Sequence, residues 1–474
     1  MDTKRLNAYK LPYLILCGVI SLFALFYLYK QEFKPLEIVV GLVSLVLFLV
    51  ILWEAIIKLV QYWFSPLPKI EFAIEAVKKR NVLKTWALIA CGVIAFHIFI
   101  YIVGYAVARI SGRLDTGFFE SMYKIWCKCG IDAPSYLGIA ENWYVTSGDP
   151  MYHIVFFPFY PIVIKAFSFI FRDYFVSAIA VSIFSSIGMA ITGYELVRLE
   201  FSEKTAKYFV VASFLLFGSF FYGAAMTESL FVFLCLLCLY FTKKRNFVCA
   251  GIFGALAGFT RSPGILLMVP VGIEYIRVLV EKIKFKPADS KITDKQVINF
   301  IADGFAVLFI SMGLIAYLLV NYSVWGNAFQ FSIFQKEHWG QQMGFFFRTV
   351  SMIAGQFYDR AIELNADSTL WDIKRAFALW LPQLVMIFGS LGVINSVKKK
   401  INAKYLCYFL LYFAFTIGAT WLLSAPRYLM ASITLPLAIA FILNNPEYRT
   451  YVISAMVVLN IAFLIAFTSL SPIY

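Results

Sequence analysis

Charged residues are scarce in this sequence. Asp, Glu, Lys and Arg make up 14% of its 474 residues, whereas hydrophobic residues make up 61% and the mean hydropathy is +0.79. Soluble globular proteins usually carry about 25% charged residues, so the composition excludes that class. Long polar stretches are scarce too, because apolar runs long enough to cross a bilayer, about 20 residues, follow one another along the chain. We therefore expect an all-α polytopic membrane protein.

Motifs for metal and nucleotide chemistry are also missing. The three histidines, His97, His153 and His338, are scattered without metal-ligand spacing, so a zinc site is not expected. No glycine-rich phosphate loop occurs, which argues against ATP or a nucleotide sugar as a direct substrate. A divalent cation, Mg²⁺ or Mn²⁺, held by carboxylates and water stays open. Its candidate ligands are Asp132, Asp149 and Glu141.

Neither the cysteines nor the positive charge indicates a further class of function. Cys235 and Cys238 have CxxC spacing but lie inside LFVFLCLLCLYF, where packing is the expected role. Cys127 and Cys129 lie in a polar loop and would form at most a minor structural feature. The net charge of +14 comes from short Lys and Arg clusters between apolar runs. Such clusters orient membrane proteins, so no nucleic-acid partner is expected.

Thirteen apolar runs are candidate membrane spans. They are 11–30, 36–62, 86–109, 174–197, 208–222, 226–241, 246–260, 263–280, 299–320, 374–395, 403–422, 428–444 and 451–469. The N-terminus has no small-residue cleavage site, so the first run is expected to stay as an anchor. We expect three parts: an N-terminal hairpin with a cytoplasmic loop (1–85), a core (86–280) and C-terminal helices (281–474).

A fourteenth apolar run, 154–171, is the exception. If it does not cross the membrane and the N-terminus is inside, the clusters around Lys204, Lys243, Lys282 and Lys398 all lie in the cytoplasm. If it crosses, all of them lie outside, against the positive-inside rule. We therefore expect 154–171 to form an amphipathic helix along the outer membrane surface. Two long loops, 110–173 and 321–373, then lie outside.

Asp132 stands out in the first outer loop, within GIDAPSYLGIAENWY. It precedes Pro134 and a short helix, so its carboxylate is expected to cap that helix. A carboxylate near a helix N-terminus stays ionised and can accept a proton from a bound hydroxyl. The two interpretations are compatible.

Three turns carry further charges to the same face. Glu228 lies in AAMTESLFVF, Arg261 in GFTRSPG and Arg427 in SAPRYLM. Each arginine taken alone is most often an interfacial anchor. Together they are suited to holding a lipid phosphate, because planar guanidinium groups match its oxygens.

The ordered segments DAPSYLGIAENWY, VFFPFYPIVIKAF, TESLFVFL and GALAGFTRSPGILL resemble the PIG-V type mannosyltransferases, that is GPI mannosyltransferase II and its bacterial relatives, of the C-type glycosyltransferase (GT-C) superfamily. The resemblance covers roughly 110–270. It implies a GT-C fold, here with the about thirteen transmembrane helices counted above, and a hexosyltransferase that uses a polyprenyl-phosphate sugar on the non-cytoplasmic side. The residue before Asp132 is Ile131, where the family usually has Trp, and Pro263 stands where Asn is frequent.

In the implied reaction Asp132 is the general base of an inverting transfer to an acceptor hydroxyl. Arg261, Arg427 and Lys165 are expected to bind the donor phosphate. The other expected substrate contacts are Tyr136, Glu141, Trp143, Asp149, His153, Phe157, Tyr160, Glu228 and His338. The aromatic members have an equal alternative as an interfacial belt.

The acceptor is a glycan, lipid or protein, for instance a cell-envelope glycan, and membrane lipids are the other partners. The bacterial plasma membrane is preferred, with the endoplasmic reticulum as the alternative. A transporter or flippase of a lipid-linked sugar is the competing function. It is expected to place ionisable residues deep in the membrane. The candidates, such as Glu54 and Lys58, lie toward a helix end in the N-terminal hairpin, while the polar set clusters outside, which favours the transferase. A non-catalytic scaffold with this fold is the third option.

Overall fold

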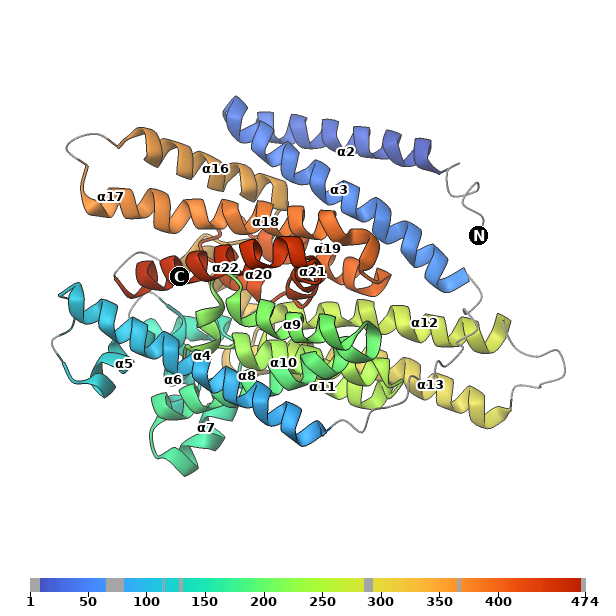
Figure 1. Cartoon of the computed structure of the whole chain (residues 1–474), viewed down its shortest axis with the longest axis horizontal. Coiled ribbons are helices and arrows are strands. Elements are labelled where there is room, and N and C mark those ends of the chain that lie inside the picture. The colour runs from blue at the N-terminus through green and yellow to red at the C-terminus, as the bar shows by residue number, and fades with distance from the viewer. Residues whose placement is uncertain are drawn as a thin grey trace.

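The computed structural model describes residues 9–64, 81–112, 114, 116–127, 131–284, 293–364 and 368–469. This part of the chain is helical, with one isolated β-bridge between Met343 and Ala419 and no strand. Most of the long helices run along the long axis of the molecule, so their ends gather at its two ends (Figure 1). The expected all-α polytopic class is confirmed.

An N-terminal hairpin packs along one side of the bundle. It consists of α2 (Lys10–Lys30) and α3 (Pro35–Phe64), and α3 lies against α16 (Phe346–Ile362) and α19 (Ala403–Ile417). A Cβ at Gly41 would lie 2.2 Å from the Ser351 hydroxyl oxygen, so glycine is what allows α3 and α16 to approach. α16 itself lies within the expected outer loop 321–373, which therefore contains a long packed helix.

The rest of the bundle is built from helices of unequal length. The long members are α4 (Val82–Ile110) and α8 (Tyr174–Glu200). The shorter ones are α9 (Glu203–Leu215), α10 (Glu228–Lys243), α11 (Phe247–Thr260), α12 (Met268–Lys284), α18 (Leu381–Val397), α20 (Ala425–Met430) and α21 (Thr434–Leu443). Two further helices, α13 (Asp294–Phe309) and α14 (Met312–Trp325), and the C-terminal α22 (Pro446–Thr468) complete it.

Helix length divides the thirteen expected spans into two groups. Seven helices of the described residues are long and apolar enough to cross a membrane, and the number rises to nine if each of two bent pairs is one span. One of these pairs, α13 with α14, covers the expected span 299–320 and bends by 46°. The five remaining expected spans correspond to α9, α10, α11, α19 and α21, which have 10 to 16 residues.

The short helices end part-way along the long ones. The Tyr101 hydroxyl of α4 donates to the Gly223 carbonyl over 2.7 Å, and the Ser182 hydroxyl of α8 donates to the Ala224 carbonyl over 2.7 Å. Tyr101 lies nine residues before the end of α4, and Ser182 eight residues after the start of α8. At 1.5 Å per residue, the turn that leads into α10 is therefore recessed by roughly 12–14 Å.

The segment 154–171 is not one continuous helix. A short helix η1 (Asp149–Val155) leads to a break at Phe156–Pro158, and α7 (Phe159–Phe171) follows at an angle of 111°. Pro158, the N-cap residue of α7, explains the break, because proline has no backbone N–H with which to continue η1. A straight span over 154–171 is thus excluded, whereas its place on the outer surface stays a prediction.

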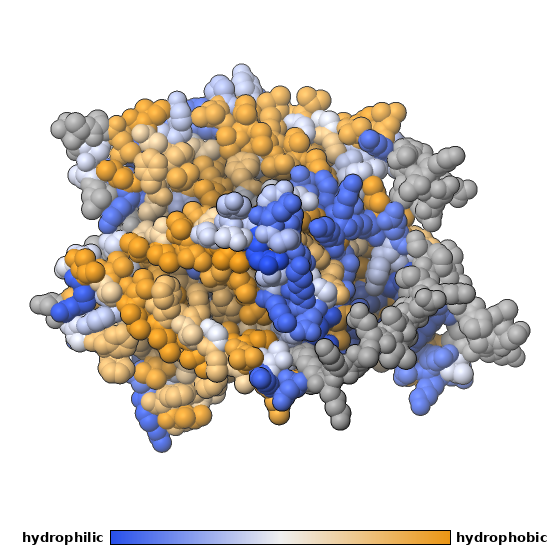
Figure 2. Space-filling view, viewed as in Figure 1, coloured by the Kyte–Doolittle hydropathy of each residue, from blue (hydrophilic) through white to orange (hydrophobic). Residues whose placement is uncertain are grey.

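The surface shows where the polar ends lie. In Figure 2 apolar side chains cover much of the left-hand part of the visible face, and hydrophilic ones gather from the middle towards the right. The right-hand end is the one to which α12 runs in Figure 1. A broad apolar belt of this kind is expected of a protein that spans a bilayer.

Candidate functional site

Asp132 is positioned by the first turn of a short helix. It occupies the N-cap position of α6 (Ala133–Asn142), with Pro134 in the first turn, as expected. Its side chain makes no capping hydrogen bond, however, so that expectation was wrong. The carboxylate instead lies 2.7 Å from Nη2 of Arg427, and the side chain is 31% exposed. The Asp132 carboxylate thus makes a long-range ion pair instead of a capping hydrogen bond.

Glu228 connects the two arginines. It is the first residue of α10 and is buried, and its Oε1 lies 2.5 Å from Nη1 of Arg261 and 3.3 Å from Nε of Arg427. The four side chains therefore alternate in sign, from Asp132 through Arg427 and Glu228 to Arg261. We call them the ion quartet; its formal charge sums to zero. Pairing is needed here because a buried unpaired charge costs several kcal/mol.

Tyr428 lies between the two guanidinium groups. Its ring centroid is 5.1 Å from Cζ of Arg261 and 5.2 Å from Cζ of Arg427, which places both within cation–π range. Arg261 also donates to the Thr227 hydroxyl over 3.3 Å. Tyr428 was missed by sequence reasoning although it directly follows Arg427, because an aromatic beside an arginine has no distinctive pattern.

Two tyrosines border the quartet. The rings of Tyr136 and Tyr160 meet edge to face at 5.5 Å, and Tyr136 also contacts Phe156. Burial raises the pKa of Tyr136 well above its ordinary value, and the negative charge of Asp132 raises it further. Its hydroxyl is therefore protonated over the whole physiological pH range. The Tyr160 hydroxyl lies 3.1 Å from that of Ser182, at the level of the recessed turn.

A slot of about 230 Å³ opens between α6 and α7. Its walls are mainly apolar, and Trp143 and Lys165 both line it. Trp143 has φ 63° and ψ −161°, a backbone region that side chains rarely adopt, and its side chain is exposed. Such strain costs of order 1–3 kcal/mol and often marks functional segments.

The remaining expected contacts lie outside the quartet. Phe157 stacks on Tyr317 with centroids 3.9 Å apart and is buried, which is a packing contact. His338 stacks on Tyr152 at 4.0 Å, so the second outer loop packs on the first. The others are spread along α6 and η1: Glu141 near the end of α6, Asp149 at the start of η1 and His153 beside Gly138.

A metal site finds little support in the described residues. Within them no three His, Cys, Asp or Glu side chains come together in a way that could hold an ion. Asp132 is already paired with Arg427, and Glu141 and Asp149 lie on different elements. We derive no step through a metal.

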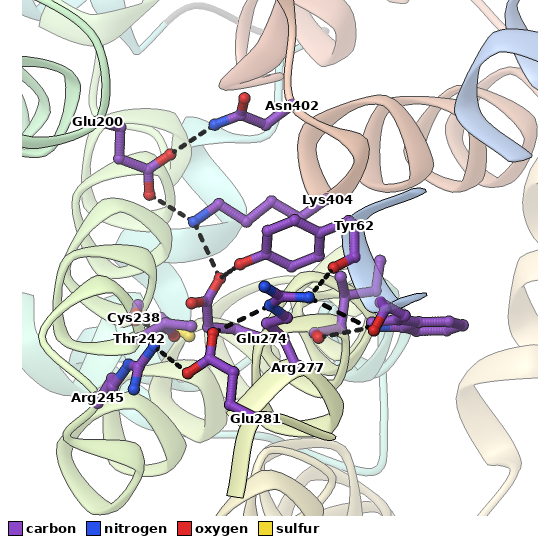
Figure 3. A network of polar contacts seen from close by, with 12 residues as sticks. Tyr62, Glu200, Cys238, Thr242, Arg245, Glu274, Arg277, Glu281, Asn402 and Lys404 are labelled. Atoms are coloured by element: carbon purple, nitrogen blue, oxygen red, sulfur yellow. Dashed lines mark hydrogen bonds and ion pairs between the residues drawn. The ribbon is translucent and has the colours of Figure 1, made fainter. Parts of the chain in front are cut away.

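A second charged network lies at the opposite end of α10 (Figure 3). Lys404 lies between Glu200, to which it donates, and Glu274 at 3.6 Å, and Tyr62 donates to Glu274 over 2.9 Å. Beside them Glu281 accepts from Arg277 over 3.0 Å and from Arg245 over 2.7 Å. The network joins α3, α8, α12 and α19. Sequence reasoning missed it, although charges within apolar runs were the available signal.

Comparisons with known proteins show a distant likeness to solved structures alone. No family model and no curated protein matches the chain. A crystal structure of the Archaeoglobus fulgidus oligosaccharyltransferase, tethered to an acceptor peptide with an NVT sequon, is similar at 12% identity and a TM-score of 0.35. The match covers 80% of this chain and 55% of that one, so this chain spans about half of its length. At that TM-score the likeness carries no argument, and the helices themselves define the chain as a multi-pass α-helical membrane protein.

Proposed function

We propose that this protein is a GT-C-type membrane glycosyltransferase that moves a hexose from a polyprenyl-phosphate carrier to an acceptor hydroxyl, with Asp132 as the general base. The observation that supports this most is the Asp132 carboxylate itself. It is the accessible end of an otherwise buried ion quartet, and Arg427 fixes one of its oxygens. A positioned carboxylate whose side chain is 31% exposed suits proton abstraction from a hydroxyl.

The proposed reaction is a single displacement. The acceptor oxygen attacks the anomeric carbon, its proton passes to Asp132, and the bond between that carbon and the phosphate oxygen breaks. The phosphate leaves with the electron pair. Attack from the face opposite the leaving group inverts the anomeric configuration, and no covalent enzyme intermediate is needed.

The cations near Asp132 would then have different roles. Arg427 is shared between Asp132 and Glu228, so we assign it to positioning the base rather than to holding phosphate. Arg261 is the more accessible guanidinium, with 12% of its side chain exposed against 5% for Arg427. Arg261 and Lys165 are therefore the proposed contacts of the leaving phosphate, whose developing charge they would stabilise.

The sugar and its carrier would lie along α6 and α7. The exposed ring of Trp143 and the rim of the adjacent slot offer apolar and aromatic surface. Tyr136 and Tyr160 are buried and would shape the wall nearer Asp132. Mannose is the proposed hexose, because the PIG-V resemblance favours it, and the site would face the non-cytoplasmic side of a bacterial plasma membrane.

Reconstitution in liposomes tests this function. The purified protein would receive polyprenyl-phosphate mannose, labelled in the sugar, together with a membrane-lipid extract, a peptide mixture or a simple mannoside as acceptor. We expect label in a new glycoside with one acceptor class, and with inverted configuration. If intact lipid-linked sugar crosses the bilayer and no glycoside forms, the protein is a flippase and the proposal is wrong.

A further inference from the structure

A second cavity lies far from the ion quartet, between the two helices of the N-terminal hairpin. It has a volume of about 290 Å³ and is lined by one face of α2 and one face of α3. On α2 the lining residues recur every three or four positions from Lys10 through Cys17 to Ser21, which is the spacing of a single helix face. We call this cavity the hairpin slot.

The walls of the hairpin slot suit an aliphatic chain. Tyr13 joins the slot's two helices, because its hydroxyl donates to the Leu49 carbonyl and its ring packs on Trp53 at 4.6 Å. Leu14 and Val50 are lining residues that remain exposed, so the slot opens toward the surroundings of the hairpin. From Lys10 to Ser21 it extends about 16 Å at 1.5 Å per residue, roughly half of the ~30 Å hydrocarbon thickness. That is the depth of one leaflet.

One end of the hairpin slot is positively charged. Lys10 and Lys398 line it there, with Glu54 as the one carboxylate. Lys398 begins the short helix η5 (Lys398–Lys400), so two more lysines follow directly. The Asn395 side-chain oxygen accepts a hydrogen bond from Lys398 over 2.6 Å, which leaves two of the three ammonium protons for another acceptor.

The hairpin is held against η5 by a separate lysine. Lys58 of α3 donates to the carbonyl oxygens of Lys399 and Ile401, over 2.7 and 2.8 Å. The charged end is therefore a fixed junction of the hairpin with the bundle. By the distribution of Lys and Arg it faces the cytoplasm, whose leaflet carries the anionic lipids.

We propose that the hairpin slot binds one anionic phospholipid of the inner leaflet. The phosphate lies between Lys10 and Lys398, and one acyl chain runs along α2 past Cys17 toward Ser21. Charge complementarity selects the headgroup, because four lysines lie at this end, Lys10, Lys398, Lys399 and Lys400, against the single lining carboxylate of Glu54. The proposal does not depend on the glycosyltransferase function.

Alkylation of Cys17 reports occupancy directly, because this thiol lines the slot. The protein would be placed in phosphatidylcholine bilayers with or without phosphatidylglycerol and treated with a membrane-permeant maleimide. Modification is measured at each cysteine by peptide mass spectrometry. Phosphatidylglycerol is expected to slow alkylation at Cys17 by about 10-fold or more, the effect of ~1.4 kcal/mol of preference. Cys91, exposed on α4, serves as the internal control and should not change.

Two double variants distinguish lipid binding in the hairpin slot from a general effect of surface charge. Lys10→Gln/Lys398→Gln should abolish the protection of Cys17. Lys243→Gln/Lys244→Gln removes the same charge from exposed lysines elsewhere on the bundle and should keep it. Equal protection by phosphatidylcholine alone, or full protection in the first variant, would overturn the proposal. So would cross-linking of Cys17 between two copies by a bifunctional maleimide, because a second copy would then cover the slot.

Discussion

Arg427 and Asp132 form an ion pair of 2.7 Å between two segments that are distant in sequence. Asp132 is the N-cap residue of α6, and Arg427 belongs to the short helix α20, almost 300 residues later in the chain. Arg427 reaches Glu228 as well, at 3.3 Å. Its guanidinium therefore fixes the proposed base relative to the first turn of α10.

Arg427→Lys tests this double contact. A lysine ammonium is a point charge without a planar set of donors, so it cannot pair with both carboxylates as the guanidinium does. We therefore expect sugar transfer to fall by about 10-fold or more, equivalent to ~1.4 kcal/mol in the barrier. Steady-state transfer rates of the reconstituted enzyme measure it. Arg172→Lys, at an exposed position after α7, is the matched control and should transfer normally. Equal rates in the two variants would contradict the positioning role.

Lys404→Met tests the second charged network, in which Lys404 lies between Glu200 and Glu274. Removing this ammonium leaves Glu200 and Glu274 buried without their cation, which should cost about 3–5 kcal/mol of stability. Thermal unfolding in detergent measures the loss as a lower Tm. Lys207→Met removes an exposed lysine 2.8 Å from Glu203 and should cost at most ~1 kcal/mol. A Tm for Lys404→Met as high as that of the control would show that the network does not stabilise the bundle.

Gly264→Ala tests how Arg261 is positioned. A Cβ at Gly264 would lie 2.3 Å from the Gly258 nitrogen and 2.6 Å from the Ala257 oxygen, both backbone atoms of α11. Because Arg261 directly follows this last turn, we expect a shifted guanidinium, with transfer reduced by about 10-fold. Gly272→Ala meets nothing within 4 Å and should behave as wild type. Full activity of Gly264→Ala would mean that this contact does not position the arginine.

Membrane orientation can be tested by labelling. In a variant without the eight native cysteines, Lys165→Cys on α7 should react with an impermeant maleimide added outside sealed cells. Lys244→Cys, after α10, should react only once the membrane is opened, because Lys and Arg clusters favour the cytoplasm. The reverse pattern would place the ion quartet on the cytoplasmic side.

The sequence predicts most of the fold because the long apolar runs form helices, although 154–171 and 299–320 are each divided by a bend, and because the lysine clusters mark one end of the bundle. It also singles out Asp132, Glu228, Arg261 and Arg427, since they are rare charges in turns between apolar runs. The pairing order among them was not predictable. Local sequence favours Asp132 as a helix cap, whereas a distant arginine offers its carboxylate a stronger, charge-assisted partner.

Two other features depend on tertiary contacts. The second charged network brings Glu200, Glu274 and Lys404 together from three helices. No local pattern in the sequence predicts which helices are neighbours. The turn before α10 is recessed because the helices that pack together differ in length. Hydropathy alone does not predict the residue at which each helix begins and ends. Pro158 similarly divides the apolar run 154–171, which is continuous by composition.

Asp132→Asn in the reconstituted transfer assay tests the central proposal most directly. The amide keeps the shape of the side chain but is too weak a base, so transfer should fall by about 10²–10⁴-fold. Asp359→Asn changes an aspartate of the expected outer loop 321–373, paired with Lys34 at 2.6 Å, and should transfer at the wild-type rate. Wild-type transfer by a folded Asp132→Asn protein, with an unchanged Tm, would contradict the assignment of Asp132 as the base.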